Sequence, residues 1–150
     1  MAKRKVAKIK KVLILGAKGM LGTDVFSVFK KDGLYDIVGY DVDSVDITKI
    51  SQIKKIFKLE KPDIVVNCAA FTRVDDCEDK QFKKICFDVN AKGPENIARV
   101  CDELGVVLVH ISTDYVFDGT RSGGYSERVH LKPVNAYGAS KAEGEKAIKS

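Results

Sequence analysis

The sequence predicts an α/β fold in which a doubly wound parallel sheet carries helices on both faces. Three observations support this fold class: short unbroken apolar runs, segments of helical apolar spacing between them, and a glycine-rich turn directly after the first run. The chain has 150 residues, of which 45% are hydrophobic and 31% charged, a composition typical of one globular domain. No apolar run approaches the roughly 20 residues that a membrane-spanning helix requires.

Strands and helices alternate along the chain. Strands are predicted at 11–15, 36–41, 63–70 and 106–112, where β-branched and leucine residues cluster. Helices are predicted at 20–33, 48–60, 79–104 and from about 135 onward, where apolar residues or strong helix formers recur. Right-handed crossovers then favour the strand order 3-2-1-4.

Single residues set the helix boundaries. Gly33 ends the first helix, Pro62 follows the second, and Gly93-Pro94 should kink or interrupt the third. The apolar positions at helical spacing in the first helix are Met20, Leu21, Val25 and Phe29.

The net charge of +5 has a local origin. Residues 1–11 hold six basic residues and no acidic one, so the rest of the chain carries −1. We interpret residues 1–10 as a solvated basic leader, because nucleic-acid proteins spread basic groups over a folded face. No nucleic-acid partner is expected. The leader lacks the apolar core of a secretory signal, which favours a cytoplasmic protein.

Cysteine and histidine do not form a metal-site pattern. The four cysteines show no C-x-x-C spacing, so we expect reduced, mostly buried thiols and no metal. His110 lies inside the fourth apolar run, where a hydrogen-bonded strand residue is a better interpretation than a catalytic one. No arrangement for Ser–His–Asp hydrolysis is present.

The turn "GAKGMLG" places Gly16, Gly19 and Gly22 between a buried strand and a helix. Glycine permits the tight turn and lets the backbone approach a pyrophosphate, while the helix N-terminus offers free N–H groups to the anion. Together with the strand before it and the helix after it, the spacing predicts a dinucleotide-binding, Rossmann-like domain over residues 11–150.

Asp41 ends the second strand, 19 residues after the last glycine. A carboxylate about 20 residues downstream suits the hydroxyls of an adenosine ribose. It would repel a 2′-phosphate and so favours NAD, whereas Lys18 in the loop could pair with that phosphate. NADH and NADPH therefore both stay open. Asp46 is a further candidate for the adenine rim.

Tyr137 and Lys141 are four residues apart, so a helix places them on one face. A nearby ammonium favours the phenolate and should lower the pKa of Tyr137 from its usual value near 10. The tyrosine could then protonate an alkoxide, while the lysine holds ribose hydroxyls. Ser112 and Thr113 follow the fourth strand, where a hydroxyl could polarise a substrate carbonyl.

The segments "GAKGMLG", "KPDIVVNCAAFTRVDDCE", "HISTDYVFDG" and "KPVNAYGASKAEGE" resemble the extended short-chain dehydrogenase/reductases, and among them the dTDP-4-dehydrorhamnose reductase family. The resemblance runs from about Lys11 to Ser150. It implies reduction of the C4 keto group of dTDP-4-dehydro-6-deoxy-L-mannose to dTDP-L-rhamnose with NADPH or NADH. The catalytic residues that it implies are Thr113, Tyr137, Lys141 and Asn90. The cofactor-binding residues, in addition to Tyr137 and Lys141, are Gly16, Gly19, Met20, Leu21, Gly22, Asp41, Asp46, Ile47, Cys68, Ala69 and Ala70.

The same residues bear on related activities. The sugar-nucleotide 4,6-dehydratases typically carry a "TDEVYG"-like stretch, and Tyr115 after Asp114 argues against dehydration. The main alternative is a non-catalytic NAD(P)-binding module, either regulatory, like the regulatory subunit of methionine adenosyltransferase, or a truncated reductase.

Family members run to roughly twice this length. We therefore expect an N-terminal portion whose sheet is truncated before its last strands and whose substrate-binding part is absent. The fourth strand should then be an exposed edge, open to self-association or to a partner chain.

Overall fold

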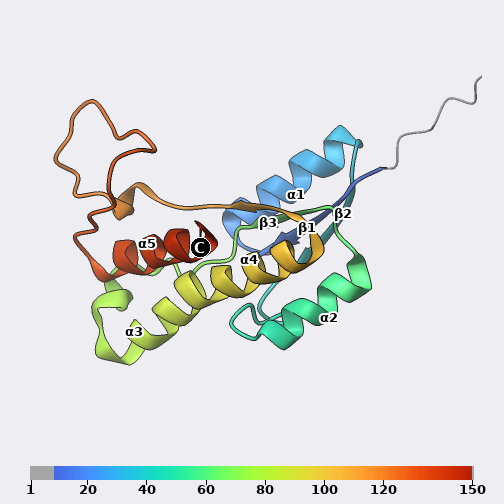
Figure 1. Cartoon of the computed structure of the whole chain (residues 1–150), viewed down its shortest axis with the longest axis horizontal. Coiled ribbons are helices and arrows are strands. Elements are labelled where there is room, and N and C mark those ends of the chain that lie inside the picture. Colours follow the sequence, from blue (N-terminus) through green and yellow to red (C-terminus); the bar gives the residue numbers. More distant parts are fainter. Residues whose placement is uncertain (1–8, 150) are drawn as a thin grey trace, which may run out of the picture.

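The computed structural model describes residues 9–149 and shows a four-stranded parallel sheet with helices on both faces (Figure 1). The strands are β1 (Lys11–Leu15), β2 (Asp36–Tyr40), β3 (Ile64–Asn67) and β4 (Val107–His110). The longer helices are α1 (Met20–Asp32), α2 (Ile50–Glu60), α3 (Lys80–Phe87), α4 (Gly93–Leu104) and α5 (Ala136–Lys149). The predicted leader at 1–10 falls almost entirely outside the described residues.

The strand order is β2-β1-β3-β4, so the predicted order 3-2-1-4 is wrong. β3 pairs with β1 through Val12↔Ile64 and the residues that follow, and β4 pairs with β3. The difference in burial explains this arrangement. Three of the four residues of β3 are buried and need neighbours on both sides, whereas β2 has no buried residue and lies at an edge.

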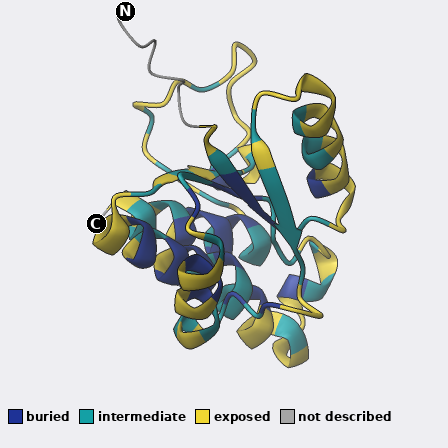
Figure 2. Cartoon of the chain, turned by 90° about the vertical axis from the view of Figure 1, so that its right-hand side faces the viewer, coloured by how far each residue is buried: buried dark blue, intermediate teal, exposed yellow. Residues whose placement is uncertain are grey.

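Alternate residues of β1 supply two separate cores. Leu13 and Leu15 pack with residues of α2 and α4, whereas Val12 and Ile14 pack with α1. Figure 1 shows α1 on one side of the sheet and α2 and α4 on the other, and Figure 2 shows buried residues along the inner faces of the helices. Along the sheet, the chain places β2 on one side of β1, and β3 followed by β4 on the other side.

The apolar face of α1 differs from the prediction at the start of the helix. Val25 and Phe29 pack against the sheet, together with Phe26, but Met20 is 90% exposed and Leu21 44% exposed. Gly33 ends α1 in the left-handed conformation with φ 70°, as predicted, and its N–H bonds the Phe29 carbonyl.

The helical run after β3 is interrupted, as predicted for Gly93-Pro94. A 3₁₀ turn, η1 (Asp75–Glu78), precedes α3, and a π-helical turn, η2 (Asp88–Lys92), separates α3 from α4. Pro94 lies in the first turn of α4, directly after this π-helical turn. A further 3₁₀ turn, η3 (Asp114–Val116), follows β4.

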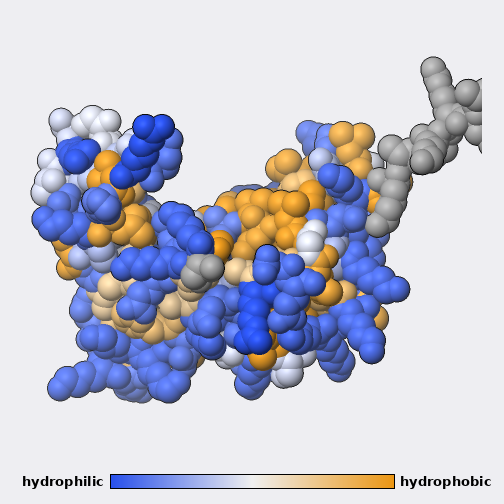
Figure 3. Space-filling view, viewed as in Figure 1, coloured by the Kyte–Doolittle hydropathy of each residue, from blue (hydrophilic) through white to orange (hydrophobic). Residues whose placement is uncertain are grey.

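β4 is an edge strand, paired with β3 alone within the described chain. Val107 is 58% exposed and Val109 45% exposed. Figure 3 shows apolar surface gathered over the strands beside α1. An unpaired parallel edge with exposed valines is an open site for strand addition. None of the helices in the described part of the chain has the length and apolar character that a bilayer span demands.

Candidate functional site

The winding of the sheet reverses between β1 and β3, and a pocket of about 450 Å³ opens at the carboxyl ends of these strands. Doubly wound sheets bind ligands at such a switch point. Seven of the predicted cofactor residues line this pocket. An eighth, Ile47, is buried and lines it as well; the others are Gly16, Gly19, Asp41, Asp46, Cys68, Ala69 and Ala70.

The glycine loop leaves no room for a side chain at two positions. Gly16 has φ +76°, and a Cβ there would lie 2.6 Å from the Ala69 nitrogen. A Cβ on Gly22 would lie 2.0 Å from the Gly16 carbonyl oxygen. Each of these neighbours is backbone and cannot rotate away. The glycines therefore bring the start of α1 against the turn after β3.

The N-terminus of α1 faces this loop. Gly19 is the N-cap residue and has no side chain to cap the helix. The N–H groups of Met20, Leu21 and Gly22 have no intrahelical acceptor, because they belong to the first helical turn. Hence Met20 and Leu21 can serve a phosphate through their backbone, while their side chains point into solvent.

Asp41 ties the glycine loop to the end of β2. Its carboxylate accepts 2.8 Å hydrogen bonds from the backbone N–H groups of Lys18 and Val42. Each oxygen retains a lone pair for a ribose hydroxyl. The Lys18 ammonium pairs with Asp43, whose hydrogen bond raises the pKa of Lys18. The positive charge of Lys18 is thus already paired with a carboxylate, although its side chain remains exposed.

Asp46 lines the same pocket, but its carboxylate is engaged locally. One oxygen accepts from the Thr48 hydroxyl at 2.7 Å and from the Thr48 N–H at 3.0 Å. These bonds lower the pKa of Asp46, and Lys49 pairs with the other oxygen at 3.3 Å. The structure therefore shows Asp46 as a residue that orders the entry to α2.

A second cluster lies at the carboxyl end of β4. Lys141 is 2% exposed, and its Nζ donates to the Ile111 carbonyl at 2.6 Å. Burial lowers the pKa of Lys141 to about 8, although Glu145 on the same helix acts in the opposite direction. An amine with this pKa can lose its proton just above neutral pH.

Tyr137 lies one helical turn before Lys141 and stacks edge-on against Tyr115, with ring centroids 5.7 Å apart. Burial raises the pKa of Tyr137, and a hydrogen bond with Thr113 opposes this rise. The sequence predicted a pKa lowered by Lys141. That prediction is wrong for this structure, because the amine is turned toward the Ile111 carbonyl and burial dominates.

Of the two hydroxyls after β4, Thr113 is the one that faces Tyr137. The Ser112 hydroxyl donates to Glu145 on α5. The Thr113 hydroxyl is half-buried, accepts from the Tyr115 N–H at 3.3 Å and contacts the phenol of Tyr137. Thr113 thus lies beside Tyr137, and Lys141 lies one helical turn further along α5.

Asn90 is not part of this cluster's reactive face. It is 1% exposed, and its amide bonds both the N–H (2.8 Å) and the carbonyl (3.0 Å) of Phe71. The same amide donates to the Ser140 hydroxyl at 3.0 Å. In this structure Asn90 holds α5 against the segment after β3, and so positions the helix that carries Tyr137.

Two glycines set the depth at which α5 packs. A Cβ on Gly138 would lie 2.1 Å from the Tyr115 carbonyl oxygen, and one on Gly144 would lie 2.3 Å from that of Asn90. Sequence reasoning missed both residues. Glycine inside a helix costs about 1 kcal/mol relative to alanine, and that cost was the signal that could have found them.

The cysteines are free thiols, as expected: Cys77, Cys86 and Cys101 are buried and Cys68 is half-buried. Burial raises the pKa of Cys77 and of Cys101 to about 12, so neither thiol is reactive at neutral pH. Across residues 9–149, no three His, Cys, Asp or Glu side chains are grouped to hold a metal ion.

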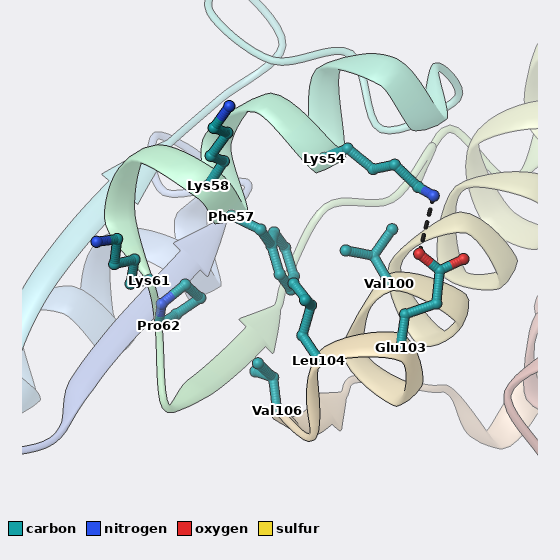
Figure 4. Close-up of a pocket in the computed structure, with 9 residues that line it drawn as sticks. All are labelled: Lys54, Phe57, Lys58, Lys61, Pro62, Val100, Glu103, Leu104 and Val106. Atoms are coloured by element: carbon teal, nitrogen blue, oxygen red, sulfur yellow. Dashed lines mark ion pairs between the residues drawn. The ribbon is translucent and has the colours of Figure 1, made fainter.

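Another pocket, of about 500 Å³, lies at the opposite end of the sheet (Figure 4). Phe57, Val100 and Val106 form its apolar wall, and Lys54 and Glu103 pair across it at 2.8 Å. Its lining carries no hydroxyl or phenol that could move a proton.

Residues 10–150 match the sequence model of the RmlD substrate binding domain. The chain belongs to this family. A dTDP-4-dehydrorhamnose reductase from Aggregatibacter actinomycetemcomitans is 36% identical over 92% of the chain, and one from Burkholderia thailandensis is 40% identical over 92%. The chain spans about half the length of these curated relatives, 46% and 45% respectively.

Solved structures of the family share the fold. A dTDP-4-dehydrorhamnose reductase from Bacillus anthracis in complex with NADP superimposes with a TM-score of 0.90 at 39% identity. The match covers 97% of the chain and 51% of that protein. A Thermus thermophilus UDP-glucose 4-epimerase complexed with NAD, at 23% identity and a TM-score of 0.82, shows the fold alone.

Proposed function

We propose that this chain forms the dinucleotide-binding and proton-transfer side of a reductase acting on a dTDP-linked keto sugar. The reaction is reduction of the C4 keto group of dTDP-4-dehydro-6-deoxy-L-mannose to dTDP-L-rhamnose, with NADPH or NADH. The observation that carries the proposal is the grouping of Thr113, Tyr137 and Lys141 at the carboxyl edge of the sheet that also carries the glycine loop. Family membership and the relatives' names support it.

The residues of the pocket fit a nicotinamide dinucleotide. The backbone cradle at Gly16 and Gly22 would be filled by any Cβ, and the first turn of α1 offers free N–H groups to a pyrophosphate. Asp41 would accept from the adenosine ribose. Lys141 would hold the nicotinamide ribose. The cofactor, when bound, supplies the hydride.

The chain's own groups manage the proton and the carbonyl. The Thr113 hydroxyl would donate a hydrogen bond to the substrate carbonyl and so stabilise negative charge on its oxygen. Tyr137, held beside Thr113, would donate its phenolic proton to that oxygen. A phenol with a raised pKa is fully protonated at neutral pH, which suits a proton donor.

The remaining partners belong to the same proposal. Most contacts to the sugar nucleotide would come from a region that corresponds to the part of the relatives that this chain does not match. The enzyme would act in the cytoplasm. Nucleic acid plays no part. The exposed edge of β4 would pair with a second copy or with a further polypeptide segment. Sedimentation showing a monomer at all concentrations, with cooperative unfolding, would contradict an open edge.

The test combines binding with turnover in the 150-residue chain. We expect NADPH or NADH to bind, seen as a change in nicotinamide fluorescence, and to be oxidised by dTDP-4-dehydro-6-deoxy-L-mannose. The Tyr137→Phe variant should bind the dinucleotide normally and lose at least about 100-fold in turnover. A folded chain that binds the dinucleotide without turnover would support the alternative, a non-catalytic NAD(P)-binding module. No binding would refute both.

A further inference from the structure

A hydrogen-bonded chain connects the nucleotide pocket to Lys141 through two strand ends. Asn67 ends β3 and His110 ends β4, and the two residues are partners in the sheet register. The Asn67 side chain is buried, with 1% exposure for the residue. Its Oδ1 accepts from the Ala69 N–H at 3.1 Å, and its Nδ2 lies 3.0 Å from His110 Nδ1.

The orientation of the Asn67 amide follows from Ala69. A backbone N–H can only donate, so the atom that faces it must be the amide oxygen. The Asn67 NH₂ group then faces His110 and donates to Nδ1. A ring nitrogen that accepts a hydrogen bond carries no proton, and the proton of the neutral imidazole must therefore sit on Nε2.

His110 Nε2 lies 3.5 Å from Lys141 Nζ. The same Nζ donates to the Ile111 carbonyl at 2.6 Å. In the Nε2–H tautomer, His110 offers the amine a donor. It therefore gives an ammonium group nothing to donate to, whereas a neutral amine could accept this N–H through its lone pair.

We propose that His110 is a positioning residue, held as the Nε2–H tautomer by Asn67, which sets the direction and the charge of the Lys141 amine. The inference rests on the proposed function, since it assigns a purpose to Lys141 in that site. Sequence reasoning interpreted His110 only as a hydrogen-bonded strand residue. The structure adds that both of its nitrogens face functional groups.

The charges around the pair are consistent with this assignment. Burial and the neighbouring Lys141 lower the pKa of His110 to about 4, so the ring is neutral at physiological pH and only its tautomer matters. Lys141 is faced by His110 and the Ile111 carbonyl from β4 and its end, and by Tyr137 and Glu145 on α5. Of these, Glu145 alone favours the ammonium through its charge, and its carboxylate is partly engaged by Ser112.

The tautomer can be measured directly in the full chain without any nucleotide. Two-dimensional ¹⁵N NMR distinguishes a protonated from an unprotonated ring nitrogen, and the chain has two histidines. His130 is exposed and serves as the internal reference. We expect a proton on Nε2 and a bare Nδ1 for His110 at neutral pH. An Nδ1–H tautomer or a doubly protonated ring would overturn the proposal.

Variants then test the link to Lys141, whose ¹³Cε signal reports its titration and is assigned with Lys141→Met. In His110→Gln an amide oxygen can take the place of Nε2–H and accept from the ammonium, so the pKa of Lys141 should rise by about one unit. In Asn67→Asp the carboxylate can accept from Nδ1–H, which should move the proton of His110 from Nε2 to Nδ1.

The matched control is His130→Gln, which should leave Lys141 unchanged. A merely structural role would lower the melting temperature of His110→Gln without moving the Lys141 titration, and that result would overturn the proposal. The NMR measurement of the His110 tautomer uses the wild-type chain and does not depend on whether any variant folds. Failure to bind NADPH would instead refute the proposed function and leave the His110 tautomer as measured.

Discussion

Gly22→Ala tests whether the backbone cradle is as tight as the structure shows. The new Cβ would lie 2.0 Å from the Gly16 carbonyl oxygen, so the loop or α1 must retreat by about 1.4 Å before ordinary contact begins at 3.4 Å. Alanine gains up to about 1 kcal/mol in a helix, but overpacking against a neighbour that cannot move costs about 1–3 kcal/mol. The clash involves backbone, so overpacking should dominate.

We expect Gly22→Ala to lose about 1–2 kcal/mol of unfolding free energy, or about 2–8 °C in melting temperature. The displaced loop should also lose at least one charge-assisted hydrogen bond to a pyrophosphate, which weakens dinucleotide affinity about 10- to 100-fold. Thermal unfolding and nicotinamide fluorescence titration measure the two effects.

Two other glycines provide the comparison. A Cβ on Gly123 meets nothing within 4 Å, so Gly123→Ala should change neither stability nor affinity. Gly19→Ala meets the Gly16 carbonyl oxygen at 3.3 Å and should keep most of the stability while still hindering a pyrophosphate. If Gly22→Ala melts and binds like the wild type, the inference of a closed cradle is wrong.

Three further predictions concern α5 and its supports. Gly144→Ala places a Cβ 2.3 Å from the Asn90 carbonyl oxygen, so it should cost about 1–3 kcal/mol in urea unfolding and reduce any turnover by displacing α5. Asn90→Leu leaves the partly buried N–H and carbonyl of Phe71 without their side-chain partner, which should cost about 1–3 kcal/mol in total; wild-type stability would contradict this. The pKa of His110 is lowered from 6.5 to about 4, so between these values the unfolded chain binds more protons than the folded chain. Stability should therefore fall as the pH drops through that window, by up to about 3 kcal/mol, and His110→Gln should remove this dependence in urea titrations at several pH values.

Local patterns were sufficient to predict the elements and the glycine loop. β1 was predicted at its observed bounds because an unbroken apolar run needs burial on both faces, and Gly33 ended α1 because glycine adopts positive φ without strain. The strands after β1 were predicted one to four residues too long, since the apolar pattern continues into the turns that carry the site. The role of the Tyr137–Lys141 pair remains a proposal, although the four-residue spacing did place both residues on one helical face.

Contacts between distant residues were decided by the tertiary structure alone. Asn67 and His110 are 43 residues apart, and Asn90 and Ser140 are 50 apart, so no local spacing connects them. Asn67 and His110 meet because β3 lies between β1 and β4, whereas the predicted order placed β3 at the edge beside β2. Periodicity and turn chemistry act within a few residues and therefore set the elements of this chain. Strand order depends on which buried faces can all be covered together, and that order decides which side chains surround Lys141.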